Sequence, residues 1–247
     1  MFSGQVIGAK WIKSIPFGVM AITLGAMNSC PTAGRPLRRD AELNRRRIID
    51  AAQELFAAKG LEPNLNDVAR HAGVGVGTVY RRFPGKEQLI EEIYADGLGM
   101  LTGLAESALR LEDSWLGFEF YVRQMCEKTA TDRAMREIVF SKAYGGERVR
   151  EARDRLVPLL QQLVARAQAD GHLRDGVSST DLPIFALLAG TVSEFAGEVD
   201  SQLWRRYVEM LLDGMRARPD QDGLPVAALA DTTLDRVMQM WEPAGPG

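Results

Sequence analysis

The 247-residue sequence contains only two cysteines and two histidines, so several kinds of site are excluded at once. Cys30 and Cys126 form neither a disulfide framework nor a zinc-binding pattern, as is typical of a protein in the reducing cytoplasm. His71 and His172 lie far apart in the sequence, and neither belongs to a metal-ligand pattern. No Ser/His/Asp triad or pair of catalytic carboxylates is recognisable. We therefore expect no catalytic residue, no metal, no cofactor and no enzyme, and we expect the protein to be cytoplasmic.

Alternating strand patterns and hairpin turns are also missing, whereas helical periodicity extends over most of the chain. No internal repeat is present. The sequence therefore predicts an all-α fold. Beyond residue 85 we expect helices at 86–109, 116–128, 131–142, 147–170, 181–195, 203–215 and 232–241, with Gly171 ending the fourth of these.

Residues 1–33 contain an apolar run, Ile15–Met27, which follows two lysines and precedes Cys30. The run resembles a short signal sequence, but it is too short and too often interrupted by Gly and Pro to span a membrane as a helix. We favour a disordered extension, or a translation start at Met20 or Met27, and expect no membrane association.

The most informative segment is Asn64–Phe83, in which two short amphipathic stretches flank a glycine. Asn64 is a favourable helix N-cap, and Asp67 three residues later gives a start that resembles a capping box. Gly73 stands where the first helix must end, in a position that suits left-handed backbone. Two helices joined by such a short glycine-containing turn form a helix-turn-helix motif.

The two faces of the second stretch differ in chemistry. Its apolar side is expected to be buried, whereas its outward side carries hydroxyl and guanidinium groups that suit the DNA major groove. An ordinary pair of core helices has the same periodicity. The outward side chains therefore distinguish a DNA-binding helix-turn-helix from such a pair. The expected buried face comprises Val76, Val79, Tyr80 and Phe83, with the Tyr80 hydroxyl reaching a phosphate, and the outward face comprises Gly77, Thr78, Arg81 and Arg82.

Residues Arg47–Gly60 and Asn66–Leu89 together resemble the TetR-type family of bacterial transcriptional regulators. The resemblance covers roughly fifty residues and includes the whole helix-turn-helix. Two positions depart from the family pattern. Pro63-Asn64 replaces a usual threonine near the start of the second helix, and Gly75 replaces a usual serine or threonine, which weakens the cap of the recognition helix.

This resemblance implies an N-terminal three-helix helix-turn-helix DNA-binding domain and a C-terminal helical domain that binds an effector and dimerises. We assign residues 34–88 to the first domain, 89–218 to the second and 219–247 to a C-terminal tail with one short helix. Lys and Arg outnumber Asp and Glu in the DNA-binding domain, whereas the rest of the chain after it is acidic. A basic head on an acidic body fits a DNA-binding module joined to a regulatory domain.

The expected DNA contacts come from a basic arm, the helix-turn-helix and the start of the next helix. Arg35, Arg38 and Arg39 are expected to precede the first helix as an arm, and Arg46 lies in its early turns, where the helix dipole opposes an arginine and phosphate is the simplest group to favour one. Lys86 opens a helix whose free amides can bind phosphate. The full set is Arg35, Arg38, Arg39, Arg46, Asn64, Gly77, Thr78, Tyr80, Arg81, Arg82 and Lys86.

The C-terminal domain of the family implies a homodimer and a small, largely apolar effector. Ordinary core packing is the alternative explanation for the residues proposed for either role. The candidate effector-pocket residues are Trp115, Phe118, Tyr121, Met125, Phe140 and Tyr144, and the candidate dimer residues are Phe185, Leu188, Val192, Leu203, Tyr207 and Leu211.

We therefore expect a transcriptional regulator, by family default a repressor, that binds double-stranded DNA at a palindromic operator and is released by its effector. The alternative is a helical ligand-binding protein or enzyme in which the helix-turn-helix does not read DNA. Binding to DNA with a steep salt dependence distinguishes the two.

Overall fold

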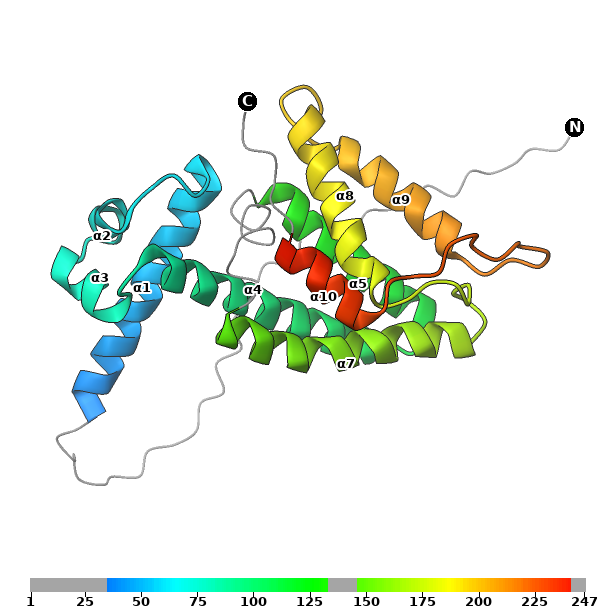
Figure 1. Cartoon of the computed structure of the whole chain (residues 1–247), viewed down its shortest axis with the longest axis horizontal. Coiled ribbons are helices and arrows are strands. Elements are labelled where there is room, and N and C mark those ends of the chain that lie inside the picture. The colour runs from blue at the N-terminus through cyan, green and yellow to red at the C-terminus, as the bar shows by residue number, and fades with distance from the viewer. Residues whose placement is uncertain (1–34, 133–145, 241–247) are drawn as a thin grey trace, which may run out of the picture.

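The structure, a computed structural model, describes residues 35–132 and 146–240. Within these ranges the chain forms nine helices and no strand beyond one isolated bridge between Leu173 and Arg216 (Figure 1). The predicted all-α fold is confirmed. The helix expected at residues 131–142 falls almost wholly outside the described residues. None of the helices described is long and apolar enough to cross a lipid bilayer.

Three helices form a head at one end of the molecule's long axis: α1 (Arg35–Lys59), α2 (Leu65–Ala72) and α3 (Val76–Arg82) (Figure 1). The long helix α4 (Lys86–Leu109) runs from this head into the body. The boundary expected between residues 88 and 89 therefore lies within a continuous helix rather than in a linker.

The start of α1 differs from the sequence expectation. Arg35, Arg38 and Arg39 were expected to precede the first helix, but α1 begins at Arg35, so that expectation is wrong. The physical reason is that Pro36 is tolerated in a first helical turn, and no helix-breaking residue follows it before Gly60. Any contact between these arginines and DNA would be made from a helix and not from an extended arm.

The body consists of α5 (Ser114–Thr131), α7 (Glu147–Ala169), α8 (Asp181–Ala196) and α9 (Leu203–Met215), together with the distal part of α4. α4 packs along α7, α5 packs along α8, and α8 packs on α9. One continuous cluster of buried apolar side chains runs from the head into this body. The head and the body are thus joined by packed side chains as well as by α4.

α5 crosses the end of α4 at very close range. A Cβ atom placed on Gly117 would lie 2.5 Å from the carbonyl oxygen of Ala108, which no side chain can tolerate. Glycine at this position therefore allows the two backbones to approach, and Asp113 caps α5 beside the crossing through a 2.9 Å hydrogen bond from the Leu116 amide.

The C-terminal tail carries the last helix, α10 (Asp231–Met240), within one residue of the expected range. Two of its apolar side chains, Leu234 and Met238, are buried against the body. The tail is thus partly docked.

Candidate DNA interface and effector cavity

The start of α2 is fixed by reciprocal capping. The Asn64 side-chain oxygen accepts hydrogen bonds from the amides of Asn66 (2.9 Å) and Asp67 (3.1 Å), and the Asp67 carboxylate accepts one from the Asn64 amide (3.0 Å). Gly73 ends the helix in the left-handed conformation at φ 65°. The predicted capping box and glycine turn are confirmed: the first fixes where α2 begins, and the second ends it ahead of α3.

Asn64→Ala is expected to lower the free energy of unfolding by about 1 kcal/mol, because two helix-start amides lose their acceptor. Asn66→Ala is the matched control, since Asn66 is exposed on the same helix turn and contributes only its backbone amide to the cap. Urea denaturation of both variants measures the difference. Equal losses in the two variants would show that the cap does not stabilise the head.

The buried side of α3 is narrower than the sequence predicted. Val79 and the following Phe83 are buried, but Val76 is 45% and Tyr80 46% exposed, so the prediction that all four share a buried face is wrong. A helix of only seven residues touches its neighbours along a single line, here through Val79 and Phe83 one turn apart. The Tyr80 ring is consequently available at the surface.

The outward side of α3 carries the polar groups expected from the sequence. Arg81 is exposed and bends back along its own helix, with Nε 3.2 Å from the Gly77 carbonyl oxygen and Nη2 3.5 Å from Thr78 Oγ1. Thr78 is half-buried, and Arg82 lies 3.8 Å from the exposed Glu42 carboxylate. These contacts are long and solvent-exposed, so exchanging them for contacts to a ligand costs little.

Two other candidates for phosphate contacts are engaged within the protein. The Lys86 ammonium donates to the Leu61 carbonyl oxygen and lies 5.8 Å from the centre of the Phe56 ring. Arg46 lies 3.3 Å from the Asp50 carboxylate and 3.7 Å from that of Asp96. Lys86 therefore ties the start of α4 to the α1–α2 connection, which its sequence position alone did not indicate.

A cavity of about 290 Å³ lies in the body between α4, α5, α7, α8 and α10. Tyr121 and Met125, two of the expected pocket residues, line it. Trp115 and Phe118 are instead buried in the core at the start of α5, where Arg216 stacks 4.5 Å from the Trp115 ring. The other two expected residues, Phe140 and Tyr144, lie outside the described part of the chain.

The wall of this cavity is mainly apolar, with a few charged side chains. Tyr121 is fully buried, and its hydroxyl has no hydrogen-bond partner among the described residues. Burial raises the pKa of Tyr121 above its ordinary value, and the neighbouring Cys126 adds to the shift. A neutral phenol at this position can donate one hydrogen bond to a bound molecule.

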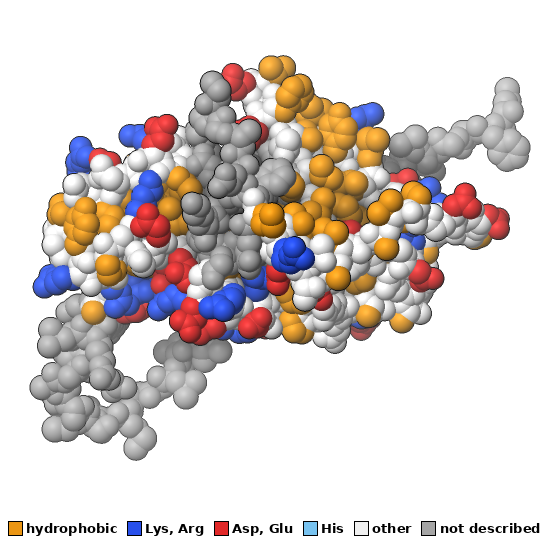
Figure 2. Space-filling model, viewed as in Figure 1, with side chains coloured by type: hydrophobic (Ala, Val, Ile, Leu, Met, Phe, Trp, Pro, Cys, Tyr) orange, Lys and Arg blue, Asp and Glu red, His pale blue; other side chains and the backbone are white. Residues whose placement is uncertain are grey.

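An apolar surface runs along α8 and α9 on the side away from α5. Figure 2 shows hydrophobic side chains gathered over α8. Phe195, Leu188, Tyr207 and Met210 are exposed there. The six residues expected at a dimer interface all retain some exposure: Leu188 and Tyr207 are exposed, and Phe185, Val192, Leu203 and Leu211 are half-buried.

Comparison with known proteins identifies the architecture. Residues 48–93 match the family described as bacterial regulatory proteins of the tetR family, and residues 116–217 match the C-terminal domain of SbtR-like transcriptional regulators. A TetR transcription regulatory protein from Mycobacterium vanbaalenii has a similar solved structure, with TM-score 0.53 and 31% identity, over 74% of this chain and all of that one. The chain belongs to the TetR family.

Other TetR-family proteins extend the comparison. The chain is 28% identical over 203 residues to the HTH-type transcriptional regulator SrpR of Pseudomonas putida, covering 79% of this chain and 86% of that protein. It also shares its fold with FadR of Bacillus subtilis, solved in complex with stearoyl-CoA, at TM-score 0.55 and 17% identity over 69% of this chain and 99% of that one. The chain is therefore a transcriptional regulator and not an enzyme.

The junction between the TetR-type head and the body contains a buried carboxylate that the sequence reasoning missed. Glu92 of α4 pairs with Arg45 of α1 and with Arg148 at the start of α7. The neighbouring Glu91 accepts a 3.0 Å hydrogen bond from the Arg148 amide. One signal was present in the sequence, since Glu92 stands between Leu89 and Ile93 in an apolar stripe, where an acid calls for a cationic partner.

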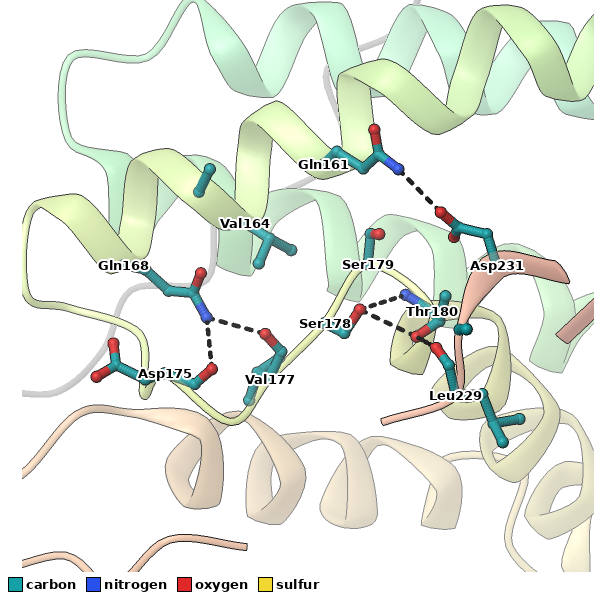
Figure 3. Close-up of a pocket in the computed structure, with 12 residues that line it drawn as sticks. Gln161, Val164, Gln168, Asp175, Val177, Ser178, Ser179, Thr180, Leu229 and Asp231 are labelled. Carbon is teal, nitrogen blue, oxygen red and sulfur yellow. Dashed lines mark hydrogen bonds between the residues drawn. The ribbon is translucent and has the colours of Figure 1, made fainter. Parts of the chain in front are cut away.

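A second, polar pocket lies beside the start of α10 (Figure 3). Its wall is held together by hydrogen bonds: Thr180 Oγ1 donates to the Leu229 carbonyl oxygen at 2.8 Å, and Gln168 Nε2 donates to the Val177 carbonyl oxygen at 2.9 Å. These polar groups form hydrogen bonds with one another, so we interpret the pocket as part of the packing contact between the tail and the body.

Proposed function

We propose that this TetR-family regulator acts in the cytoplasm as a dimeric repressor, binds an inverted-repeat operator through its two α3 helices, and is released by a small effector. The observation that carries the proposal is the exposed side of α3. Thr78, Tyr80 and Arg81 lie on that side, and the opposite side of the helix packs into the head. Tyr80 and Arg81 are exposed, and Thr78 is half-buried.

The chemistry of this surface suits DNA. Arginine donates two parallel hydrogen bonds to a guanine edge, and threonine and tyrosine hydroxyls reach bases or phosphates. Gly77 at the start of α3 carries no side chain, and a Cβ there would meet nothing within 4 Å, so the helix can lie close to the duplex. The arginine contacts now made within α3 are those that DNA would replace.

Dimerisation is supported by the apolar surface of α8 and α9. Exposed Phe, Leu, Tyr and Met side chains gathered on two adjacent helices are typical of an interface in a homodimer. A twofold axis through this surface would place two α3 helices on one DNA molecule, with successive major grooves about 34 Å apart. An inverted-repeat operator follows from that symmetry.

Effector release is supported by the apolar cavity between α4 and its neighbours. A ligand that binds better when α4 holds the heads at a spacing unsuited to DNA would shift the population away from the DNA-bound form. Repression is proposed because a dimer bound over a promoter blocks polymerase.

Arg81→Ala is expected to weaken binding to the preferred operator by about 1–3 kcal/mol and to relax sequence preference at one base pair of each half-site. The matched control is Arg110→Ala. Arg110 is also exposed and also donates to a hydroxyl three residues earlier, that of Ser107 at 2.8 Å, but it lies at the far end of α4.

The measurement is a titration of operator DNA, chosen by selection from random sequences, against both variants and the parent protein. We expect Arg110→Ala to bind like the parent. The proposal would be refuted if Arg81→Ala kept full affinity and preference, or if both variants lost affinity equally for all DNA.

A further inference from the structure

The side of α10 that faces the cavity combines apolar and acidic residues. Asp231, Leu234, Asp235 and Met238 recur at the spacing of one helix face, and all four line the cavity. Leu234 and Met238 are buried, whereas Val237 and Met240 on the remaining surface are exposed. The tail thus inserts two apolar side chains and two carboxylates at the cavity wall.

The two carboxylates bind polar groups of α7. Asp235 forms an ion pair with Arg153, and Asp231 accepts a 3.1 Å hydrogen bond from Gln161 Nε2. Arg153 and Gln161 lie about two helical turns apart on the same side of α7, with Leu156 and Leu160 of the cavity wall between them. Figure 3 shows the Gln161–Asp231 end of this attachment. α10 therefore lies along α7 and closes the cavity.

The attachment is made by side chains and not by close backbone packing. α10 is absent from the helix pairs whose backbones pack closely, and a helix of ten residues is marginal by itself in water. It also follows residue 217, where the match to the family's C-terminal domain ends. α10 therefore lies outside the matched domain and outside the close packing of the four helices beneath it.

The charged residues of the cavity wall that do not belong to α10 indicate which ligand would suit the cavity in its absence. Without Asp231 and Asp235, the charged lining residues are Lys128, Arg153 and Asp154; Lys128 pairs with Asp132 at 2.9 Å, so Arg153 is the lining cation whose ion pair with α10 is broken. The rest of the lining is largely apolar, and the Tyr121 hydroxyl can donate a hydrogen bond. This arrangement favours an apolar molecule with one anionic group.

We propose that α10 is a built-in plug of the cavity and that the effector is an anionic amphiphile, a molecule with an apolar body and one carboxylate. The effector displaces α10 when its carboxylate replaces Asp235 as the partner of Arg153 and its apolar body fills the space of Leu234 and Met238. This inference rests on the proposed effector response. A volume of about 290 Å³ is at the low end for ligand sites, and departure of the two apolar side chains enlarges it.

Three probes that share one apolar chain and differ in their polar group test the ligand's charge: octanoate, octanol and octylammonium. Each is titrated calorimetrically into the full chain. We expect octanoate to bind most tightly. Asp235→Asn should tighten octanoate binding about three- to tenfold, because a competing charge is removed and the open form is more populated. Arg153→Gln should remove the preference for octanoate over octanol while octanol still binds.

Arg218→Gln is the control, because it breaks a surface ion pair with Asp213 (2.6 Å) away from the cavity and should leave all three affinities unchanged. Amide hydrogen exchange supplies the second readout: residues 231–240 should exchange faster when octanoate saturates the protein. Equal binding of the three probes, no binding, or octanoate binding with α10 still protected would each overturn the proposal.

The DNA assay separates this inference from the proposed function. If the protein selects and binds an operator but none of the probes binds, the ligand and plug assignments fail and DNA recognition stands. If octanoate displaces α10 but no operator can be selected, the plug stands and the regulator mechanism fails.

Discussion

Leu188→Asp combined with Phe195→Asp should convert the protein to a monomer and weaken operator binding by about 10²–10⁴-fold, because the second head no longer binds as part of the same molecule. The two side chains lie two turns apart on α8 and are 45% and 87% exposed, so the changes should not disturb folding of the single chain. Burying two carboxylates in an apolar interface is strongly unfavourable.

The matched control for this experiment is Leu111→Asp with Val226→Asp. These residues are 41% and 77% exposed and lie in loops outside α8 and α9. Light scattering and DNA titration report the outcome. A double variant on α8 that remained dimeric would place the interface elsewhere, and a monomer with unchanged operator affinity would show that two heads are not needed.

Glu92→Gln is expected to lower the free energy of unfolding by about 3 kcal/mol, near the lower end for breaking a buried ion pair. The Glu92 side chain is 8% exposed and that of its partner Arg45 is 13% exposed, so the arginine would be left largely buried with the exposed Glu42 carboxylate, at 3.1 Å, as its remaining counter-charge. We expect a loss of stability near the lower end of this range because Arg148, the other ion-pair partner of Glu92, is exposed. Urea denaturation gives the measurement.

The same variant tests how the head is coupled to the body. Glu92 joins α1 of the head to α7, which lines the cavity proposed to bind the effector, so Glu92→Gln should also weaken any effector-dependent release from DNA. Glu106→Gln, an exposed residue on the same helix, is the control. A loss for Glu92→Gln no larger than that for Glu106→Gln would mean that the ion pairs contribute no net stability.

The features predictable from the sequence are those determined by neighbouring residues. The Asn64 cap and the Gly73 turn depend on groups within a few positions along the chain, and both are confirmed. The ranges of α9 and α10 follow from periodicity and breakers in the same way.

The features that were missed depend on which surfaces meet in three dimensions. Periodicity assigned Val76 and Tyr80 to the buried face, but the width of that face is set by how α2 contacts α3. The phosphate contact expected of Lys86 stays a prediction, but its hydrogen bond to the Leu61 carbonyl group, in another part of the head, was not foreseen. The wall of the cavity likewise includes α10, whose docking on α7 depends on pairs such as Arg153–Asp235 that no local pattern reveals.

The central claim is that two copies of the exposed α3 surface lie in successive major grooves of one DNA molecule. Methylation interference on a selected operator, with the full chain as ligand, tests it directly. We predict two patches of guanine N7 interference, related by inverted-repeat symmetry and centred about one helical turn apart. Interference in one groove only, or none in any selected sequence, would contradict the account.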